Sequence, residues 1–189
     1  MSDIQRLYNE YQEAAKRLTD AMRSDPPEPV SDYTFKTPGG SVTLSELFGG
    51  RDELLLIHNM GKKCSYCTLW ADGLNGQADH YADRSAFVVV SPDEPEVQAE
   101  FARSRGWKFP VASCAGTTFA KDMGYEPEPG KHWPGASAFL KKPDGSIVRT
   151  GRTMFGPGDP YCPIWHLMDL LPRGRGEWAP KYVYGDAAG

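Results

Sequence analysis

The residues of this sequence best suited to chemistry are two cysteines, Cys64 and Cys67, separated by Ser65 and Tyr66. Two thiols at this spacing can close into a small disulfide ring and reopen. The apolar stretch Leu54–Ile57 precedes them and has the composition of a buried strand. A strand, a short loop and a Cys-x-x-Cys pair at the start of a helix form the order that a dithiol redox site needs.

The two thiols are expected to have different roles. A free thiol has a pKa of about 8.5, and the N–H groups at a helix N-terminus favour the thiolate. Lys63 directly precedes Cys64 and adds positive charge that favours its thiolate further. We therefore expect Cys64 to attack a disulfide and Cys67, one helical turn deeper, to resolve the mixed disulfide. This cycle needs no bound cofactor and no metal. It needs only a disulfide-containing protein or small molecule as substrate, and an external electron donor.

A structural zinc site in a non-enzymatic binding protein is the alternative from another class. Cys162 and His166 have the spacing of a second ligand pair, but most of the second half of the chain separates them from Cys64 and Cys67. The apolar strand before Cys64 favours redox chemistry. Cys114 is expected to be a passive, partly buried thiol, and the sequence leaves open whether Cys162 shuttles electrons to the pair.

Three side chains near the pair are weighed as participants. His58, on the strand that leads to the pair, is either a proton relay or a hydrogen-bonded core residue, and the second is commoner. Asp72 is a candidate proton acceptor for Cys67, although an acid on a helix is more often solvated. Trp70, one turn after Cys67, is expected to pack in the core.

Composition and charge exclude several classes of function. The chain has 189 residues and a net charge of −4, and it lacks a basic stripe that could neutralise nucleic-acid phosphates. No apolar run reaches the roughly 18 residues of a membrane span. The charged N-terminus lacks the apolar core of a signal peptide. We therefore expect a cytoplasmic protein with neither a nucleic-acid nor a membrane partner, in a compartment where thiols stay mostly reduced.

The chain is expected to divide into an N-terminal helix with a Pro-rich linker, 1–30, and one domain, 31–189. Apolar residues recur at helical spacing over residues 3–23. We expect this helix to pack against the domain, while a homodimer through it is possible. Further helices are expected at 44–48, after residue 64 with a break near Gly73 and Gly76, from Asp93, at 117–123 and at 164–171. Trp178 and Tyr182 are expected to anchor the irregular tail.

Short strands are expected between these helices, at 33–35, 41–44, 54–59, 86–90, 109–112, 136–141 and 146–150. Strands that alternate with helices indicate an α/β fold with a mainly parallel central sheet and helices on both faces. The last two strands form a hairpin around the turn Pro143-Asp144-Gly145, and we expect it to add antiparallel edge strands, which makes the sheet mixed.

The stretch LLLIHNMGKKCSYC, with GGSVTLSELFGGRD before it, resembles the peroxiredoxin and TlpA branch of the thioredoxin superfamily. More closely, CSYCTLWADGLNG and YCPIWHLMDLLPRGRGEW are similar to domain of unknown function 899. That family is described as thioredoxin-like, with a predicted dithiol–disulfide oxidoreductase activity. The resemblance covers the chain from about Tyr33 onward. It implies a thioredoxin-like three-layer sandwich with an N-terminal helical extension.

The same resemblance implies a substrate groove and shows two departures. In the superfamily layout, a loop that faces the dithiol would line the groove, here with Trp133, Pro134, Gly135 and Ala136. The superfamily's proline would fall near Ala136, but the nearest proline is Pro134. Peroxiredoxins place a threonine three residues before the reactive cysteine, where this chain has Gly61. The second departure argues against peroxide chemistry. A thiol peroxidase that uses Cys64 is therefore kept only as the alternative enzyme.

Overall fold

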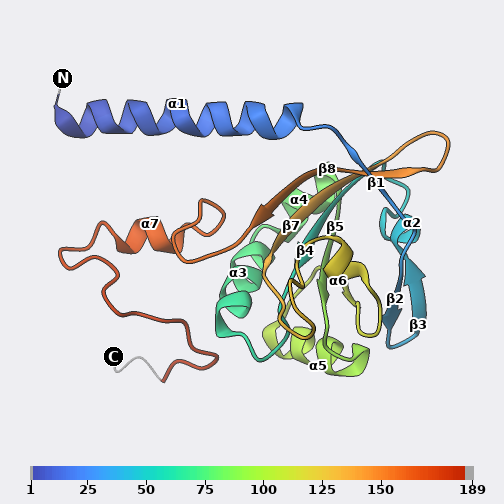
Figure 1. Ribbon diagram of the computed structural model, residues 1–189. Coiled ribbons are helices and arrows are strands. Elements are labelled where there is room, and N and C mark those ends of the chain that lie inside the picture. The colour runs from blue at the N-terminus through green and yellow to red at the C-terminus, as the bar shows by residue number, and fades with distance from the viewer. Residues whose placement is uncertain (1, 186–189) are drawn as a thin grey trace.

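The computed structural model describes residues 2–185, whose strands form one eight-stranded sheet in the order β1-β8-β7-β4-β5-β6-β2-β3 (Figure 1). The strands β4, β5 and β6 are parallel, and β7 runs antiparallel to β4. In chain order the strands are β1 (Glu28–Val30), β2 (Thr34–Thr37), β3 (Gly40–Thr43), β4 (Glu53–His58), β5 (Ala86–Ser91), β6 (Val111–Ser113), β7 (Gly135–Lys141) and β8 (Ile147–Met154).

The helices are α1 (Asp3–Ser24), α2 (Leu44–Leu47), α3 (Ser65–Asn75), α4 (Ala78–Arg84), α5 (Pro95–Arg105), α6 (Phe119–Asp122) and α7 (Ile164–Met168). Alternate residues of the central strands face opposite sides of the sheet. Leu54 and Leu56 of β4 pack in a core with α2 and α6, whereas Ile57 packs in a second core with α3, α4 and α7. These three layers confirm the predicted thioredoxin-like sandwich.

Two helix boundaries can be explained by local chemistry. The predicted break after the cysteine pair is confirmed, because α3 ends at Asn75 with Gly76 as its C-cap, and α4 begins at Ala78. The next helix begins later than predicted, at Pro95 rather than at Asp93. Strand β5 continues to Ser91, and the Asp93 carboxylate accepts a hydrogen bond from the Lys62 N–H at 2.6 Å instead of opening a helix.

The sheet extends further than the sequence indicated. The predicted edge position of the hairpin is wrong, because β7 lies between β4 and β8, and β1 pairs outside β8. The predicted Pro-rich linker is therefore shorter, since Glu28–Val30 belongs to the sheet. Pro29 has no N–H to donate, and an edge strand is where a sheet tolerates a proline. The edges of the sheet are β1 and β3.

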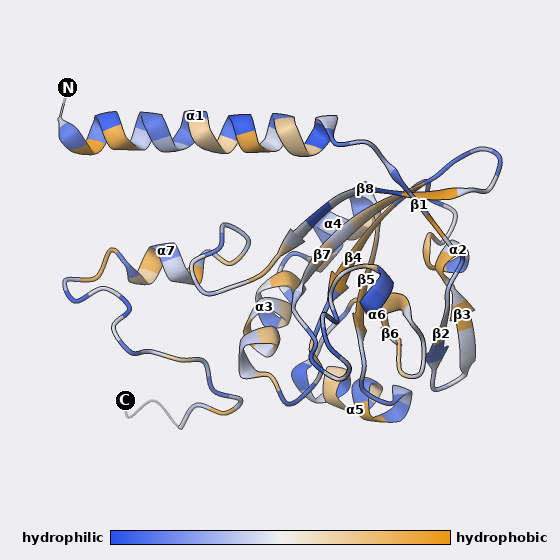
Figure 2. Cartoon of the chain, in the orientation of Figure 1, coloured by the Kyte–Doolittle hydropathy of each residue, from blue (hydrophilic) through white to orange (hydrophobic). Residues whose placement is uncertain are grey.

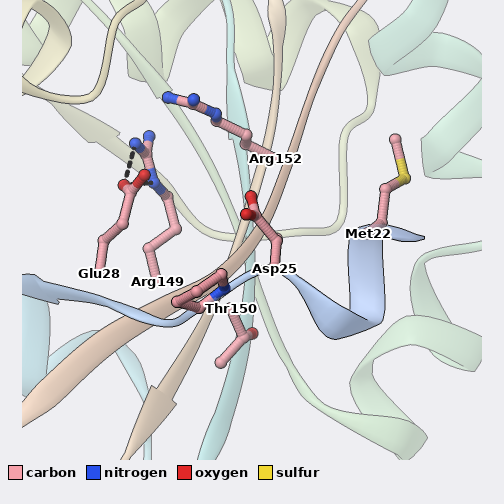
Figure 3. A pocket seen from close by; sticks show the side chains of 8 residues that line it. Met22, Asp25, Glu28, Arg149, Thr150 and Arg152 are labelled. Carbon is pink, nitrogen blue, oxygen red and sulfur yellow. Dashed lines mark hydrogen bonds and ion pairs between the residues drawn. The ribbon is translucent and has the colours of Figure 1, made fainter. Parts of the chain in front are cut away.

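An ion pair between the buried Arg149 and the exposed Glu28 holds β1 against β8. Arg149 is only 5% exposed, its Nε donates to Glu28 Oε2 at 2.9 Å, and its Nη1 donates to the Met123 carbonyl at 2.7 Å. Figure 3 shows this pair beside Met22 and Asp25, where α1 ends. The Glu28–Arg149 pair therefore fixes the point at which α1 leaves the sheet.

Helix α1 lies apart from the sheet over most of its length (Figure 1). Its N-cap is Ser2, whose side chain accepts a hydrogen bond from the Gln5 N–H at 3.3 Å. None of its residues is buried, so the prediction that it packs against the domain is wrong. Only its last turn, at Met22, reaches the residues of β8. Among residues 2–185, no helix has both the length and the apolar character that crossing a membrane requires.

We predict that Arg149→Met lowers the free energy of unfolding by about 1–3 kcal/mol, because the Met123 carbonyl and Glu28 lose their charged donor. Urea denaturation of the two proteins measures the difference. Arg152→Met is the matched control, since Arg152 lies on the same strand and is exposed. Equal losses in both variants would contradict a specific role for the Glu28–Arg149 pair.

Candidate functional site

The two cysteines lie where β4 gives way to α3. Strand β4 ends at His58, the chain turns through residues 59–63, and Cys64 is the N-cap of α3. Its extended backbone turns the side chain toward the first turn of the helix, where Cys64 Sγ accepts a hydrogen bond from the Cys67 N–H at 3.1 Å. A sulfur thus takes the capping role that serine or aspartate commonly fills. The predicted position of the pair at a helix N-terminus is confirmed.

The environments of the two sulfurs differ in the way that a dithiol site requires. The Cys67 thiol donates to Cys64, and the N–H groups of Cys67 and Tyr66 add to its effect. Together they lower the pKa of Cys64 to about 6 against the opposing effect of burial. Cys67 is only 2% exposed, and its pKa is raised because its proton is held by Cys64 and because it is buried. Cys64 is half-buried and therefore reachable.

Lys63 was expected to lower the pKa of Cys64. The residue is exposed, and the interactions that lower this pKa come from Cys67 and from the backbone of the helix. A contribution from Lys63 therefore stays a prediction.

The loop before Cys64 is held by side chains that the sequence did not single out. Asn59 Oδ1 accepts a hydrogen bond from the Gly61 N–H at 2.8 Å, and Met60 N–H donates to Cys67 Sγ at 3.4 Å. Gly61 has a φ of 96°, and a Cβ built on it would lie 2.7 Å from Asp93 Oδ1. The Asp93 carboxylate thus fills the space where a side chain at position 61 would stand. A threonine at position 61 would therefore clash with this carboxylate.

The predicted groove residues lie at the same edge of the sheet as the dithiol. Gly135 pairs with His58, and Ala136 pairs with Ile57, so β7 begins where β4 ends. Trp133 is 51% exposed, whereas Ala136 is 8% exposed. The Pro134 carbonyl accepts a hydrogen bond from the Phe155 N–H at 2.9 Å. Contact of these residues with a substrate stays a prediction.

The three other side chains considered from sequence have structural partners. His58 is buried, its Nε2 lies 2.9 Å from Ser137 Oγ, and burial lowers its pKa well below the usual value. It is therefore a core residue rather than a proton relay. Asp72 pairs with Arg105 and accepts from Trp107 Nε1 at 2.8 Å, which leaves it no role as acceptor for Cys67. Trp70 is buried, as predicted.

The remaining cysteines are buried away from solvent. Burial raises the pKa of Cys114 to about 12, which agrees with the prediction of a passive thiol. Burial also raises the pKa of Cys162, which packs in the core that contains Trp165. In residues 2–185, no group of three or more histidine, cysteine, aspartate or glutamate side chains is arranged to hold a metal ion. The zinc alternative therefore lacks a second ligand pair in this part of the chain.

Tyr182 lies near the dithiol, which the sequence did not indicate. Its carbonyl accepts a hydrogen bond from Arg105 Nη1 at 2.8 Å, and its ring packs edge-on against Phe101 at 6.4 Å. Burial and then the negative charge of Cys64 raise its pKa, so the phenol is within electrostatic reach of that sulfur. The predicted anchoring of the tail by Trp178 and Tyr182 is confirmed, since Trp178 packs against Trp165.

Comparisons with known proteins agree with this geometry. Residues 6–186 match the family described as "Bacterial protein of unknown function (DUF899)". No curated protein matches the sequence.

Several solved structures share the fold. Peroxidoxin BcpB from Mycobacterium tuberculosis is 24% identical, with a TM-score of 0.54 over 68% of this chain and 84% of that chain. Reduced Prx3 in complex with H2O2 from Vibrio vulnificus is 15% identical, with a TM-score of 0.52 over 70% of this chain and 88% of that chain. The peroxiredoxin-like protein from Aquifex aeolicus is 16% identical, with a TM-score of 0.51 over 68% and 74%. These likenesses show a thioredoxin-like fold of the peroxiredoxin kind.

We predict that alkylation of Cys64 by iodoacetamide reaches half its maximal rate near pH 6. A lowered pKa means that the thiolate persists down to about pH 6 and is protonated only below it, so the rate falls on acidification. In Cys67→Ala the main donor is lost, and the half-maximal pH should rise toward that of a free thiol. Cys114→Ala is the control that should leave the profile unchanged. A half-maximum above pH 8 in the parent protein would contradict the arrangement.

Gly61→Ala should lower the free energy of unfolding by about 1–3 kcal/mol, because the new Cβ meets the Asp93 carboxylate at a positive φ. It should also slow the alkylation of Cys64 at pH 7, since the loop before that residue must shift. Denaturation curves and the alkylation rate measure the two effects. Gly39→Ala is the matched control, because a Cβ there meets nothing within 4 Å. Identical behaviour of both variants would show that the loop is not held as described.

Proposed function

We propose that this chain, which belongs to the bacterial family DUF899, is a dithiol–disulfide oxidoreductase in which Cys64 attacks and Cys67 resolves. The observation that supports this most is the placement of the two cysteines at the start of α3, where Cys64 Sγ accepts the Cys67 N–H at 3.1 Å. The accessible sulfur has a lowered pKa, and the buried sulfur has a raised one. Environments that push the pKa values of two neighbouring groups apart assign one as the nucleophile and the other as the proton holder.

In the first step, the Cys64 thiolate attacks one sulfur of a substrate disulfide. The substrate S–S bond breaks, a mixed disulfide forms at Cys64, and the other substrate sulfur leaves as a thiolate that takes up a proton. The half-buried position of Cys64, beside the fully buried Cys67, directs this attack to one sulfur of the pair.

The second step follows from the loss of charge at Cys64. The pKa of Cys67 is raised by its hydrogen bond to Cys64, by burial and by the negative charge of Cys64. Once Cys64 is neutral in the mixed disulfide, the first and third causes disappear, while the Met60 N–H still stabilises the Cys67 thiolate. Cys67 then gives up its proton and attacks Cys64 Sγ, and the second substrate thiol is released. The substrate gains two electrons, and an external dithiol later reduces the Cys64–Cys67 disulfide.

The substrate is a disulfide in a protein or a small molecule, in keeping with a half-buried but reachable nucleophile and an exposed Trp133 at the same edge of the sheet. We propose that Trp133, Pro134, Gly135 and Ala136 line the approach to Cys64. The proposed compartment is the cytoplasm, where thiol donors keep such a pair reduced.

A thiol peroxidase is the second candidate, and the likeness of the fold to peroxiredoxins supports it. In that reaction, the Cys64 thiolate would attack a peroxide O–O bond, form a sulfenic acid and release water or an alcohol. Cys67 would then condense with the sulfenic acid and release water. The space at Gly61, filled by the Asp93 carboxylate, makes this loop unlike the one that carries the peroxiredoxin threonine.

We predict that the protein reduces insulin disulfides with dithiothreitol as donor and that Cys64→Ser abolishes the turnover. Cys67→Ser should stop turnover after the first step and accumulate a mixed disulfide at Cys64, because serine keeps a hydrogen-bond donor but cannot resolve. Mass spectrometry of the quenched reaction detects that adduct. Cys114→Ser is the control and should keep full turnover.

Peroxide consumption by the same variants separates the two enzymes. If hydrogen peroxide is turned over much faster than insulin, and this activity is lost in Cys64→Ser, the protein is a peroxidase rather than an oxidoreductase. Full insulin turnover in Cys64→Ser would contradict both.

A further inference from the structure

Helix α1 carries a seam of apolar side chains that nothing else in residues 2–185 covers. The seam follows a heptad spacing of three and four residues and consists of Ile4, Leu7, Tyr11, Ala14, Leu18 and Ala21. Ile4 is 81% exposed, Leu7 54% and Leu18 56%, and the helix contains no buried residue. Figure 2 shows hydrophobic segments that alternate with hydrophilic ones along α1, which stands apart from the sheet. In proteins, most of the stability of such a helix comes from packing of its apolar face.

We propose that α1 of one copy pairs antiparallel with α1 of a second copy, so that the protein is a two-fold symmetric dimer. In this register, Ile4 lies opposite Ala21 of the second copy, Leu7 opposite Leu18, and Tyr11 opposite Ala14. Each large side chain except the leucines faces a small one, as interdigitating layers of a helix pair require. Two-fold symmetry repeats every layer, so the same residues of both copies form the interface.

The charges on α1 favour the same partner and the same orientation. The first half of the helix carries three acids, Asp3, Glu10 and Glu13, and one base, Arg6. The second half carries three bases, Lys16, Arg17 and Arg23, and one acid, Asp20. Antiparallel pairing places the acidic half of each helix beside the basic half of the other. A parallel pair would place like halves together.

One pair of charges flanks the seam in this register. Glu10 and Arg17 both precede a seam position, so Glu10 of each copy lies beside Arg17 of the other. Glu10 already bonds to Arg6 within its own helix at 2.8 Å and has a second lone pair to offer. Arg17 has no ion-pair partner among residues 2–185, so the second copy would supply one.

The surface beside the seam extends the same contact. Met22, which follows the last seam residue, also lines a groove of about 590 Å³ with apolar walls that include Leu55, Ile57, Tyr81 and Phe155. Since Ile4 of the second copy lies opposite Ala21, its first turn reaches the mouth of this groove. The pairing of β1 with β8 and the Glu28–Arg149 ion pair hold α1 at this position (Figure 3).

Sedimentation velocity of the full chain over a concentration series tests the proposal. The expected species has twice the chain mass of 20.9 kDa. Leu18→Glu should raise the dimer dissociation constant by more than about a hundredfold, because it buries a carboxylate in two symmetric layers. Thr19→Glu adds the same charge on the opposite face of the helix and should leave the constant within about twofold.

Charge reversal tests the partner and the register. Glu10→Arg and Arg17→Glu should each weaken the dimer roughly tenfold, since each sets like charges side by side twice. The double variant should restore the original constant. Lys16→Glu makes the same charge change one residue from Arg17, outside the seam, and should have little effect. Circular dichroism of each variant reports whether α1 remains helical.

A monomer at every concentration would overturn the proposal. A dimer that withstands Leu18→Glu would also overturn it, because its interface would lie elsewhere. A dimer lost in both single charge variants but not restored in the double variant would contradict the antiparallel register.

Discussion

The proposed chemistry of this protein depends on the interaction between the Cys67 thiol and Cys64 Sγ. It lowers the pKa of the outer sulfur and raises that of the inner one, so that one proton is held between two groups with different tasks. Cys64 caps α3, which turns its side chain back over the first helical turn, where its sulfur also accepts the Cys67 N–H. The cap follows closely on β4, which ends six residues before it.

The side chains around the cysteine pair bond to the backbone of the loop before α3 rather than to the two sulfurs. Asp93 and Asn59 hold the loop before α3 by accepting backbone N–H groups, and Gly61 allows the turn that brings Met60 N–H to Cys67. These contacts hold the loop that precedes Cys64 through its backbone.

Much of this arrangement could be predicted from sequence because it depends on local patterns. The apolar strand Glu53–His58, the cysteine spacing and the glycines near Gly76 each determine a neighbouring element. Other features depend on residues far apart in the chain. The strand at Glu28–Val30 pairs with β8 and bonds to Arg149, and the tail is held where Arg105 donates to the Tyr182 carbonyl. The free position of α1 could not be read from its amphipathic pattern, because that pattern does not specify which surface covers it.

A redox titration with thiol labelling and mass spectrometry tests the central claim most directly, because it reads each cysteine separately. The protein is equilibrated with mixtures of reduced and oxidised dithiothreitol, and its free thiols are then labelled. The account predicts that Cys64 and Cys67 lose their labels together in one two-electron step, while Cys114 and Cys162 keep theirs. Independent loss of the two labels, or a bond from Cys64 to Cys114 or Cys162, would contradict it.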